Sequence, residues 1–183
     1  DRPFLHHVLD HLAHHVADEV LLSSPYLGAV FEGFVRAWTG LPRITWITEA
    51  TPLGTAGALA NAALHVNETI LVLNGDILTD LDLTELVAFH RDRGAAGTIT
   101  LTPVEDARPF GLVATEEDGR VLEFREKPAD PVPGWVNAGT YVLEPSAVAA
   151  IPAGRAVSIE HETFPDLIRS GRPLFGFRSR AYW

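Results

Sequence analysis

The most informative stretch of the sequence for its architecture is Thr69-Ile70-Leu71-Val72-Leu73-Asn74-Gly75-Asp76. Residues 70–73 are apolar on both faces, which is typical of a strand buried in a parallel sheet. Ligands of open α/β sheets bind beyond the carboxyl ends of the strands. We therefore expect Asp76 to stand at this edge, where a carboxylate suits a hard cation such as Mg²⁺. The alternative role for a Gly-Asp pair is turn capping.

Helices and strands alternate around this stretch in the first half of the chain. Apolar residues at helical spacing and short β-branched runs predict helices over 3–17, 26–38, 55–66 and 84–93 and strands over 20–22, 44–48 and 69–73. Gly94 suits the position after the last of these helices. The alternation indicates a parallel sheet covered by helices on both faces.

The second half is richer in hairpins, with turn signals such as Glu117-Asp118-Gly119. Its predicted strands are 98–104, 111–115, 121–125 and 136–143, and its predicted helices are 146–151 and 160–170. Together the two halves predict one three-layer α/β domain over residues 1–183. Its mixed, mostly parallel sheet has helices on both faces and added antiparallel strands.

The composition excludes several classes of protein. The chain has 183 residues, with 24 acidic and 14 basic side chains and a formal net charge of -10, which argues against a broad basic face for nucleic acid. No apolar run approaches the roughly 20 residues that cross a bilayer. Cysteine is absent, which excludes disulfides and thiolate metal sites. We expect a soluble, cytoplasmic protein.

A glycine-containing turn follows the predicted strand over 44–48. The turn, Thr51-Pro52-Leu53-Gly54-Thr55-Ala56-Gly57, opens a helix. Small residues there would let a ligand approach the backbone, and a helix N-terminus attracts phosphate or the polar edge of a base. The G-x-G-x-x-G spacing of dinucleotide-binding proteins is missing, which argues against an NAD-dependent oxidoreductase.

Two later strands also carry polar groups or glycine. Lys127, in Glu126-Lys127-Pro128, is the only lysine of the chain, and a solvated pair with Glu126 is the alternative to a functional role. Asn137 and Gly139 interrupt the apolar strand over 136–143. Glycine inside a strand marks a bulge or the close approach of a ligand.

Five histidines crowd the first predicted helix, and His7 and His11 have the i, i+4 spacing of a metal-binding pair. All five lie outside the apolar stripe that runs from Leu5 to Leu12, which predicts a solvent-facing band. No acidic general base stands between the pair as in a metalloprotease motif. We expect no metal site here. The five are His6, His7, His11, His14 and His15.

Four short motifs occur in the order and spacing of a known protein family. They are Pro52-Leu53-Gly54-Thr55-Ala56-Gly57-Ala58-Leu59, Asn74-Gly75-Asp76, Glu126-Lys127-Pro128 and Asn137-Ala138-Gly139-Thr140-Tyr141. On these motifs the chain resembles the sugar-1-phosphate nucleotidyltransferases, and within them the mannose-1-phosphate guanylyltransferase-like branch. The resemblance implies the Rossmann-like fold of nucleotide-diphospho-sugar transferases.

The resemblance also implies a role for each matching residue. Asp76 would be a catalytic residue and a ligand of the Mg²⁺ cofactor, and Lys127 would bind the phosphate of the sugar phosphate. Glu160 matches more weakly. Further substrate contacts are implied for Glu126, Asn137 and Gly139 on the sugar and for Gly54, Thr55, Ala56 and Gly57 on the base and ribose.

The implied reaction joins a nucleoside triphosphate and a sugar 1-phosphate, GTP and mannose 1-phosphate in this branch, and releases pyrophosphate. Three alternatives stay open: a glucose-1-phosphate thymidylyl- or uridylyltransferase, a non-catalytic regulatory protein that binds a nucleotide sugar, and a structural domain in which the motifs have lost their function. The expected partners are these two substrates, without nucleic acid or membrane. A homo-oligomer is compatible with the sequence.

Two parts of the family pattern fall outside residues 1–183. The Gly-rich loop that cradles the triphosphate would immediately precede Asp1, and the second metal-binding Asp would shortly follow Trp183. We therefore expect residues 1–183 by themselves to release no pyrophosphate. A Gly-rich loop upstream of Asp1 would favour the enzyme over the regulatory protein.

Overall fold

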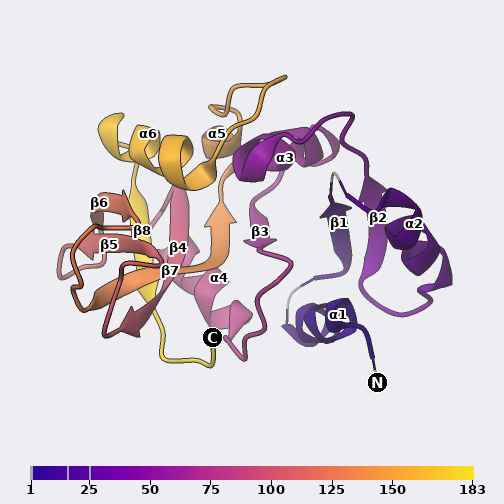
Figure 1. Cartoon of the computed structure of the whole chain (residues 1–183), viewed down its shortest axis with the longest axis horizontal. Coiled ribbons are helices and arrows are strands. Elements are labelled where there is room, and N and C mark those ends of the chain that lie inside the picture. The colour runs from indigo at the N-terminus through magenta and orange to yellow at the C-terminus, as the bar shows by residue number, and fades with distance from the viewer. Residues whose placement is uncertain (1, 16, 25) are drawn as a thin grey trace.

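A computed structural model describes residues 2–15, 17–24 and 26–183 (Figure 1). The elements of the first half are α1 (Phe4–His15), β1 (Glu19–Ser23), α2 (Gly28–Ala37), β2 (Arg43–Ile47), α3 (Gly54–Ala62), the 3₁₀ turn η1 (Ala63–His65), β3 (Ile70–Leu73) and α4 (Leu83–Asp92). Those of the second half are β4 (Gly97–Val104), β5 (Gly111–Thr115), β6 (Val121–Glu126), β7 (Gly134–Leu143), α5 (Pro145–Val148), the π-helical turn η2 (Ile159–Thr163), α6 (Phe164–Arg169) and β8 (Leu174–Arg178).

The long strand β7 is the centre of a six-stranded mixed sheet. Strand β4 pairs with both halves of β7 on one side, and β8 adds to β4 in parallel. On the other side β5 pairs with β7 at Val136, and β3 pairs with it over Thr140–Leu143. Because β7 and β6 run against the other four strands, most of the sheet points one way. The α/β fold with a mixed sheet and added antiparallel strands is confirmed.

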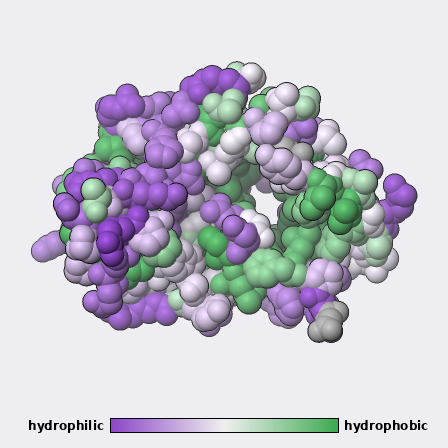
Figure 2. Space-filling view, viewed as in Figure 1, coloured by the Kyte–Doolittle hydropathy of each residue, from purple (hydrophilic) through white to green (hydrophobic). Residues whose placement is uncertain are grey.

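Strands β1 and β2 form a separate parallel pair. We refer to residues 19–47 as the β1–β2 unit. Apolar side chains gather on its surface, where Tyr26, Leu27 and Val30 are exposed (Figure 2). The single continuous parallel sheet expected for the first half is therefore not formed by the described residues, since β3 pairs only with β7.

Helices cover the six-stranded sheet on both faces (Figure 1). On one face α3, α5 and α6 pack on β4 and β7 in a core that includes Ile99 and Phe164. On the other face α1 and α4 pack together over a second core that includes Leu12 and Leu86. These two apolar layers give the three-layer arrangement that the sequence predicts. Among the described helices, none combines the length and apolar character needed to cross a membrane.

The structure has one strand that the sequence did not predict, and several of the predicted boundaries differ from the observed ones. Strand β8 was not predicted, because Gly176 interrupts its apolar run. A Cβ at Gly176 would lie 2.5 Å from a Leu101 methyl carbon, so close strand packing requires glycine there. The helix predicted over 160–170 is a π-helical turn followed by α6, and the helix predicted over 146–151 shortens to α5.

The histidines of α1 are only in part solvent-facing. His7 and His14 are exposed, whereas His6, His11 and His15 are half-buried. His6 packs against aromatic rings of α2 and its C-terminal end, which the pattern of α1 alone does not reveal. Burial is the main cause that lowers the pKa of His11, and the neighbouring His15 adds to it. Val16, inside the predicted first helix, lies outside the described residues.

Candidate active site

A pocket of about 240 Å³ lies beside the ends of β3, β6 and η2 and the bulge of β7. It brings together five residues that the sequence singled out, although they are up to 84 positions apart. They are Asp76, Glu126, Asn137, Gly139 and the weaker match Glu160. Lys127 and the turn of Gly54 to Gly57 are not part of its lining.

Asp76 follows β3 at the edge of the sheet, as predicted. The preceding Asn74 fixes this segment to β7, because its backbone N–H donates to the carbonyl of Gly139 at 2.9 Å. The Asp76 side chain is exposed, and within the described residues it accepts no hydrogen bond. A capping aspartate would accept one from a nearby backbone N–H. The structure therefore leaves this carboxylate available to a ligand.

Asn137 and Gly139 form a bulge in β7 that shapes the pocket. The register of β7 against β4 shifts between Ile99 and Leu101, opposite this segment. Gly139 has a φ of 72°, and a Cβ there would lie 2.3 Å from a methyl carbon of Ile77. The Asn137 Oδ1 accepts from the Gly139 N–H at 2.9 Å. The predicted bulge is confirmed, and its glycine is required by local packing.

The Asn137 amide is partly committed to the protein. Its Nδ2 donates to the Tyr141 hydroxyl at 3.0 Å, while its Oδ1 holds Gly139. Burial raises the pKa of Tyr141 well above its ordinary value, so this phenol stays neutral. One N–H and one lone pair of the amide remain for a ligand. Any ligand would thus meet an amide whose orientation is already fixed.

Glu126 ends β6 and is half-buried in the pocket wall. It pairs with Gly111 of β5, where a Cβ would lie 2.8 Å from the Glu126 Oε2. Burial raises the pKa of this carboxyl, and the negative charge of Glu160 adds to the effect. His161 and Lys127 act in the opposite direction. The pocket therefore contains two carboxylates that repel each other.

Lys127 adopts a strained backbone conformation beside the pocket. Its φ is 47°, although it precedes Pro128, a position that disfavours helical conformations. The Lys127 N–H donates to the Phe110 carbonyl at 2.9 Å, which helps to hold the turn. The ammonium is exposed and makes no ion pair with Glu126 within the described residues. Lys127 thus acts on Glu126 through its charge without a direct ion pair, and backbone strain of this kind is common at functional sites.

The glycine turn before α3 packs on another part of the chain. Backbone N–H groups of Ala56 and Gly57 donate to the Val157 carbonyl at 2.9 and 3.3 Å. A Cβ at Gly54 would lie 2.7 Å from the same carbonyl, and Gly54 has a φ of 69°. Small residues are therefore required here by the protein's own backbone. Two of the N–H groups expected to attract a ligand are already occupied, while Gly54 and Thr55 remain exposed.

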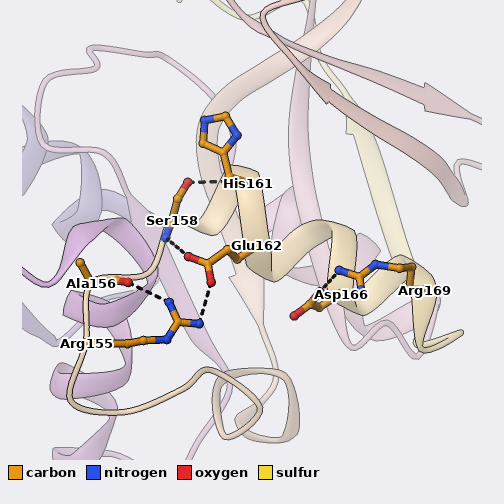
Figure 3. A network of polar contacts seen from close by, with 7 residues as sticks. All are labelled: Arg155, Ala156, Ser158, His161, Glu162, Asp166 and Arg169. Atoms are coloured by element: carbon orange, nitrogen blue, oxygen red, sulfur yellow. Dashed lines mark hydrogen bonds and ion pairs between the residues drawn. The ribbon is translucent and has the colours of Figure 1, made fainter.

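The segment that packs on this turn ends in the π-helical turn η2, which sequence reasoning did not foresee (Figure 3). Ser158 caps η2, because its hydroxyl accepts from the His161 N–H at 3.1 Å. The same hydroxyl donates to the Glu160 Oε2 at 2.8 Å. Single π-helical turns occur frequently at functional sites. The only signal in the sequence is the polar run Glu160 to Thr163 before Phe164.

An aromatic pair completes the pocket and was also missed. The rings of Phe110 and Trp183 meet edge to face with centroids 5.0 Å apart. The Trp183 indole N–H donates to the Ala138 carbonyl at 2.9 Å, which fixes the ring against β7. Trp183 lies far from the pocket motifs in sequence, so only the fold brings it there. The pocket lining thus combines carboxylates and an amide with aromatic rings.

This lining suits a small, uncharged molecule rich in hydroxyl groups. Carboxylates are pure acceptors and match hydroxyl donors, whereas the rings match the apolar face of such a molecule. The lining includes no lysine or arginine. The volume falls below the about 300–1,000 Å³ of drug-sized ligand pockets, so one sugar ring is a better match than a whole nucleotide sugar.

Comparison with known proteins agrees with this picture. The family described as "Nucleotidyl transferase" matches residues 1–183. A mannose-1-phosphate guanylyltransferase of Mycobacterium tuberculosis is 42% identical, covering 99% of this chain and 51% of that protein. A mannose-1-phosphate guanyltransferase of Pichia angusta is 35% identical, covering 100% of this chain and 52% of that protein. The chain spans about half the length of these relatives.

The fold also matches solved structures. The crystal structure of HddC from Yersinia pseudotuberculosis superimposes with a TM-score of 0.84. The two chains are 24% identical, and the match covers 99% of this chain and 78% of HddC. At that level of identity the likeness shows the fold alone, and it does so over the β1–β2 unit as well as the six-stranded sheet.

Proposed function

We propose, on the premise that this chain belongs to the nucleotidyl transferase family, that its complete protein transfers a nucleotidyl group to a sugar 1-phosphate. The observation that carries the proposal is the pocket of Asp76, Glu126, Asn137 and Gly139, which combines a free carboxylate with a lining suited to a sugar. We further propose that the sugar phosphate is mannose 1-phosphate and the donor GTP. The names of the relatives that are 34–42% identical support this choice.

The sugar ring would occupy the pocket, with Glu126 accepting a hydrogen bond from a hydroxyl and the fixed Asn137 amide contacting the ring edge. Since the pocket lining has no cation, the phosphate of the sugar would point away from the carboxylates. Lys127, which directly follows β6, is our candidate to bind it, because its ammonium is exposed and makes no ion pair among the described residues. The exposed Gly54 and Thr55 would face the nucleoside.

The reaction needs no nucleophile from the protein. An oxygen of the sugar phosphate attacks the α-phosphorus of the triphosphate in line, forming one P–O bond while the bond to pyrophosphate breaks. The main obstacle is the alignment of two anions, and positioning of this kind is worth about 7–11 kcal/mol. Glu126, Asn137 and Lys127 would supply that positioning on the sugar side.

Asp76 fits a ligand of Mg²⁺, because it is an exposed carboxylate without a protein partner at the edge of the sheet. The described residues contain no group of three or more His, Cys, Asp or Glu side chains arranged to hold a metal. Phosphate oxygens and water would therefore complete the shell, as is usual for this ion. When bound, Mg²⁺ would offset negative charge on the phosphoryl oxygens.

The test is a substrate matrix with the complete protein. GTP, UTP and dTTP would each be paired with mannose 1-phosphate and glucose 1-phosphate, and pyrophosphate and nucleotide sugar would both be measured. We expect kcat/KM for GTP with mannose 1-phosphate to exceed that of every other pair by at least about tenfold. A preference for glucose 1-phosphate with UTP or dTTP would assign the protein to the other branch. Binding of a nucleotide sugar without turnover would favour the regulatory protein.

A further inference from the structure

The π-helical turn η2 carries two carboxylates in contrasting surroundings. Glu162 points to the chain before the turn, where its Oε2 accepts from Arg155 Nη2 at 2.7 Å and its Oε1 accepts from the Ser158 N–H at 3.4 Å (Figure 3). The hydrogen bond from Arg155 lowers the pKa of Glu162. Glu162 is thus tied to the protein and does not line the pocket.

Glu160 lines the same pocket as Glu126, and one of its two carboxyl oxygens accepts hydrogen bonds from the protein. Its Oε2 accepts from the Thr55 hydroxyl at 3.1 Å and from the Ser158 hydroxyl at 2.8 Å. Among the described residues no hydrogen bond reaches its Oε1. The side chain is therefore anchored through one oxygen, while the other keeps its capacity to accept a hydrogen bond.

Both hydroxyls that hold Glu160 are oriented by the backbone. Thr55 Oγ1 accepts from the Ile159 N–H at 2.8 Å, and Ser158 Oγ accepts from the His161 N–H at 3.1 Å. A hydroxyl has a single proton. Because each of these oxygens already accepts from an N–H, its proton is directed to Glu160. Glu160 therefore receives both hydroxyl protons on Oε2, which fixes the position of its carboxyl group.

Thr55 also matters because it is an exposed residue of the first turn of α3 and does not line the pocket. Its hydrogen bonds to Ile159 and Glu160 span 104 and 105 positions of sequence. Any shift of the turn at Gly54 and Thr55 would therefore move the Glu160 carboxylate. One side chain joins the part of the surface assigned to the nucleoside to the pocket assigned to the sugar.

Resting on the proposed function, we propose that Glu160 is a sugar-binding residue whose free oxygen accepts a hydrogen bond from a ring hydroxyl of the hexose 1-phosphate. Thr55 is the positioning residue that sets this carboxylate and couples it to the nucleoside-side turn. A hydroxyl donor is the natural ligand for Glu160, because it satisfies an acceptor without adding charge to a pocket lined by the carboxylates of Asp76, Glu126 and Glu160.

The first experiment compares Glu160→Gln with Glu162→Gln in the complete protein. Loss of a charge-assisted hydrogen bond to the sugar is expected to raise KM for the hexose 1-phosphate about tenfold. The matched change two residues away should leave this KM within about twofold, because Glu162 faces Arg155. Equal KM values for the two variants would overturn the assignment of Glu160.

Monodeoxy analogues of the hexose 1-phosphate identify the contact directly. For the analogue that lacks the hydroxyl bound by Glu160, the wild-type and Glu160→Gln proteins should bind equally well by calorimetry. For the other analogues the wild-type protein should bind about tenfold more tightly than Glu160→Gln. An advantage that persists with every analogue would contradict the contact. Calorimetry decides this even without turnover, so failure of the proposed function and failure of this contact are distinguishable.

The second experiment tests Thr55 as a positioning residue. Thr55→Val keeps the shape of the side chain but removes its hydroxyl, and Thr55→Ser restores a donor. We expect Thr55→Val to raise KM for the hexose 1-phosphate about fivefold and Thr55→Ser to return it to within about twofold of wild type. Combined with Glu160→Gln, Thr55→Val should add little. A KM effect confined to the nucleoside triphosphate would refute the coupling.

Discussion

The β1–β2 unit and the six-stranded sheet both contain long apolar runs, yet they bury them to very different extents. In β4 the first six residues, Gly97–Thr102, are all buried. Helix α2 carries Phe31, Phe34 and Val35 but has no buried residue at all. The difference is one of partners: β4 lies between β7 and β8, whereas β1 and β2 pair only with each other. Apolar sequence alone does not produce a core.

The same division applies to the candidate active site. Every residue that lines the pocket belongs to the part of the chain from Asn74 onward. None comes from the β1–β2 unit among the described residues. A two-stranded pair is marginally stable by itself, whereas a multi-stranded sheet packed between helices can hold side chains in place. The residues that line the pocket therefore belong to the part of the chain that contains most of the buried core.

The largest effect should come from the core of the six-stranded sheet. Ile99 has 0% exposure, so Ile99→Ala removes buried carbon and leaves a cavity. We expect it to lower the free energy of unfolding by about 3–4 kcal/mol. Val30 of α2 is 63% exposed, and Val30→Ala should change the stability by less than about 0.5 kcal/mol. Urea unfolding gives the free energy of unfolding of both variants. Similar losses for Ile99→Ala and Val30→Ala would contradict the difference in burial between the two regions.

The next effect concerns chemistry at the edge of the same sheet. Asp76→Ala in the complete protein should lower kcat at least about a hundredfold, equivalent to roughly 2.7 kcal/mol of transition-state stabilisation. Stability should not change, because this carboxylate is exposed. Asp130→Ala is the control, since Asp130 is exposed and outside the pocket. Near-normal turnover of Asp76→Ala at saturating Mg²⁺ would remove Asp76 from the metal site.

A smaller effect should separate the two substrates. Lys127→Ala is expected to raise KM for the sugar 1-phosphate about tenfold, roughly 1.4 kcal/mol, and KM for the triphosphate far less. Lys127→Arg should rescue poorly, because a planar guanidinium directs its donors differently from a compact ammonium. Steady-state kinetics with each substrate varied in turn gives both values. Small and equal changes in both KM values would indicate that Lys127 is a solvated surface residue without a role in binding the sugar phosphate.

The smallest effect should come from a group of hydrogen bonds at the end of β7. Glu144, at the end of β7, accepts from Thr69 at 2.7 Å and contacts the buried His90 at 3.1 Å. The Thr69 hydrogen bond, with His90, lowers the pKa of Glu144 below its ordinary value of 4.5. Its contribution to stability is therefore present above pH 4.5 and is lost as the pH falls through the lowered pKa.

Glu144→Gln removes this contribution and should cost about 1 kcal/mol at pH 7. The stability of the wild-type protein should then approach that of the variant as the pH falls below about 4.5. Unfolding measured from pH 7 to pH 3 tests the direction of the change. If the difference in free energy of unfolding between the wild type and Glu144→Gln is the same from pH 7 to pH 3, the charge of Glu144 makes no contribution to stability.

Local chemistry was sufficient to predict much of the scaffold and several site residues. The apolar run ending at Asp76 predicted a strand and an edge carboxylate, and both are confirmed. Glycine at 139 predicted a bulge or the close approach of a ligand, and the structure has the bulge, with the side chains of Ile77 and Asn74 close to the glycine. These predictions succeed because each feature depends on a few adjacent residues, through strand periodicity or the conformational freedom of glycine.

The features that sequence reasoning missed depend on distant partners. Gly54 and Gly57 suggested room for a ligand, and nothing in the sequence indicated that the backbones of Val157 and Arg155 also approach these glycines closely. The anchoring of Glu160 by Thr55 joins segments 105 positions apart. Neither contact leaves a periodic signal in the chain, because hydrogen bonds between loops depend on where the sheet brings those loops.

The sequence alone thus determined the helix and strand periods, the turn glycines and the types of side chain available for chemistry. Only the tertiary structure decided which carboxylates share a pocket, which N–H groups stay free and which apolar runs become a core. The physical reason is the range of the interactions. Backbone preference and side-chain periodicity act over a few residues, whereas burial, charge repulsion and hydrogen-bond partners depend on the packing of whole layers.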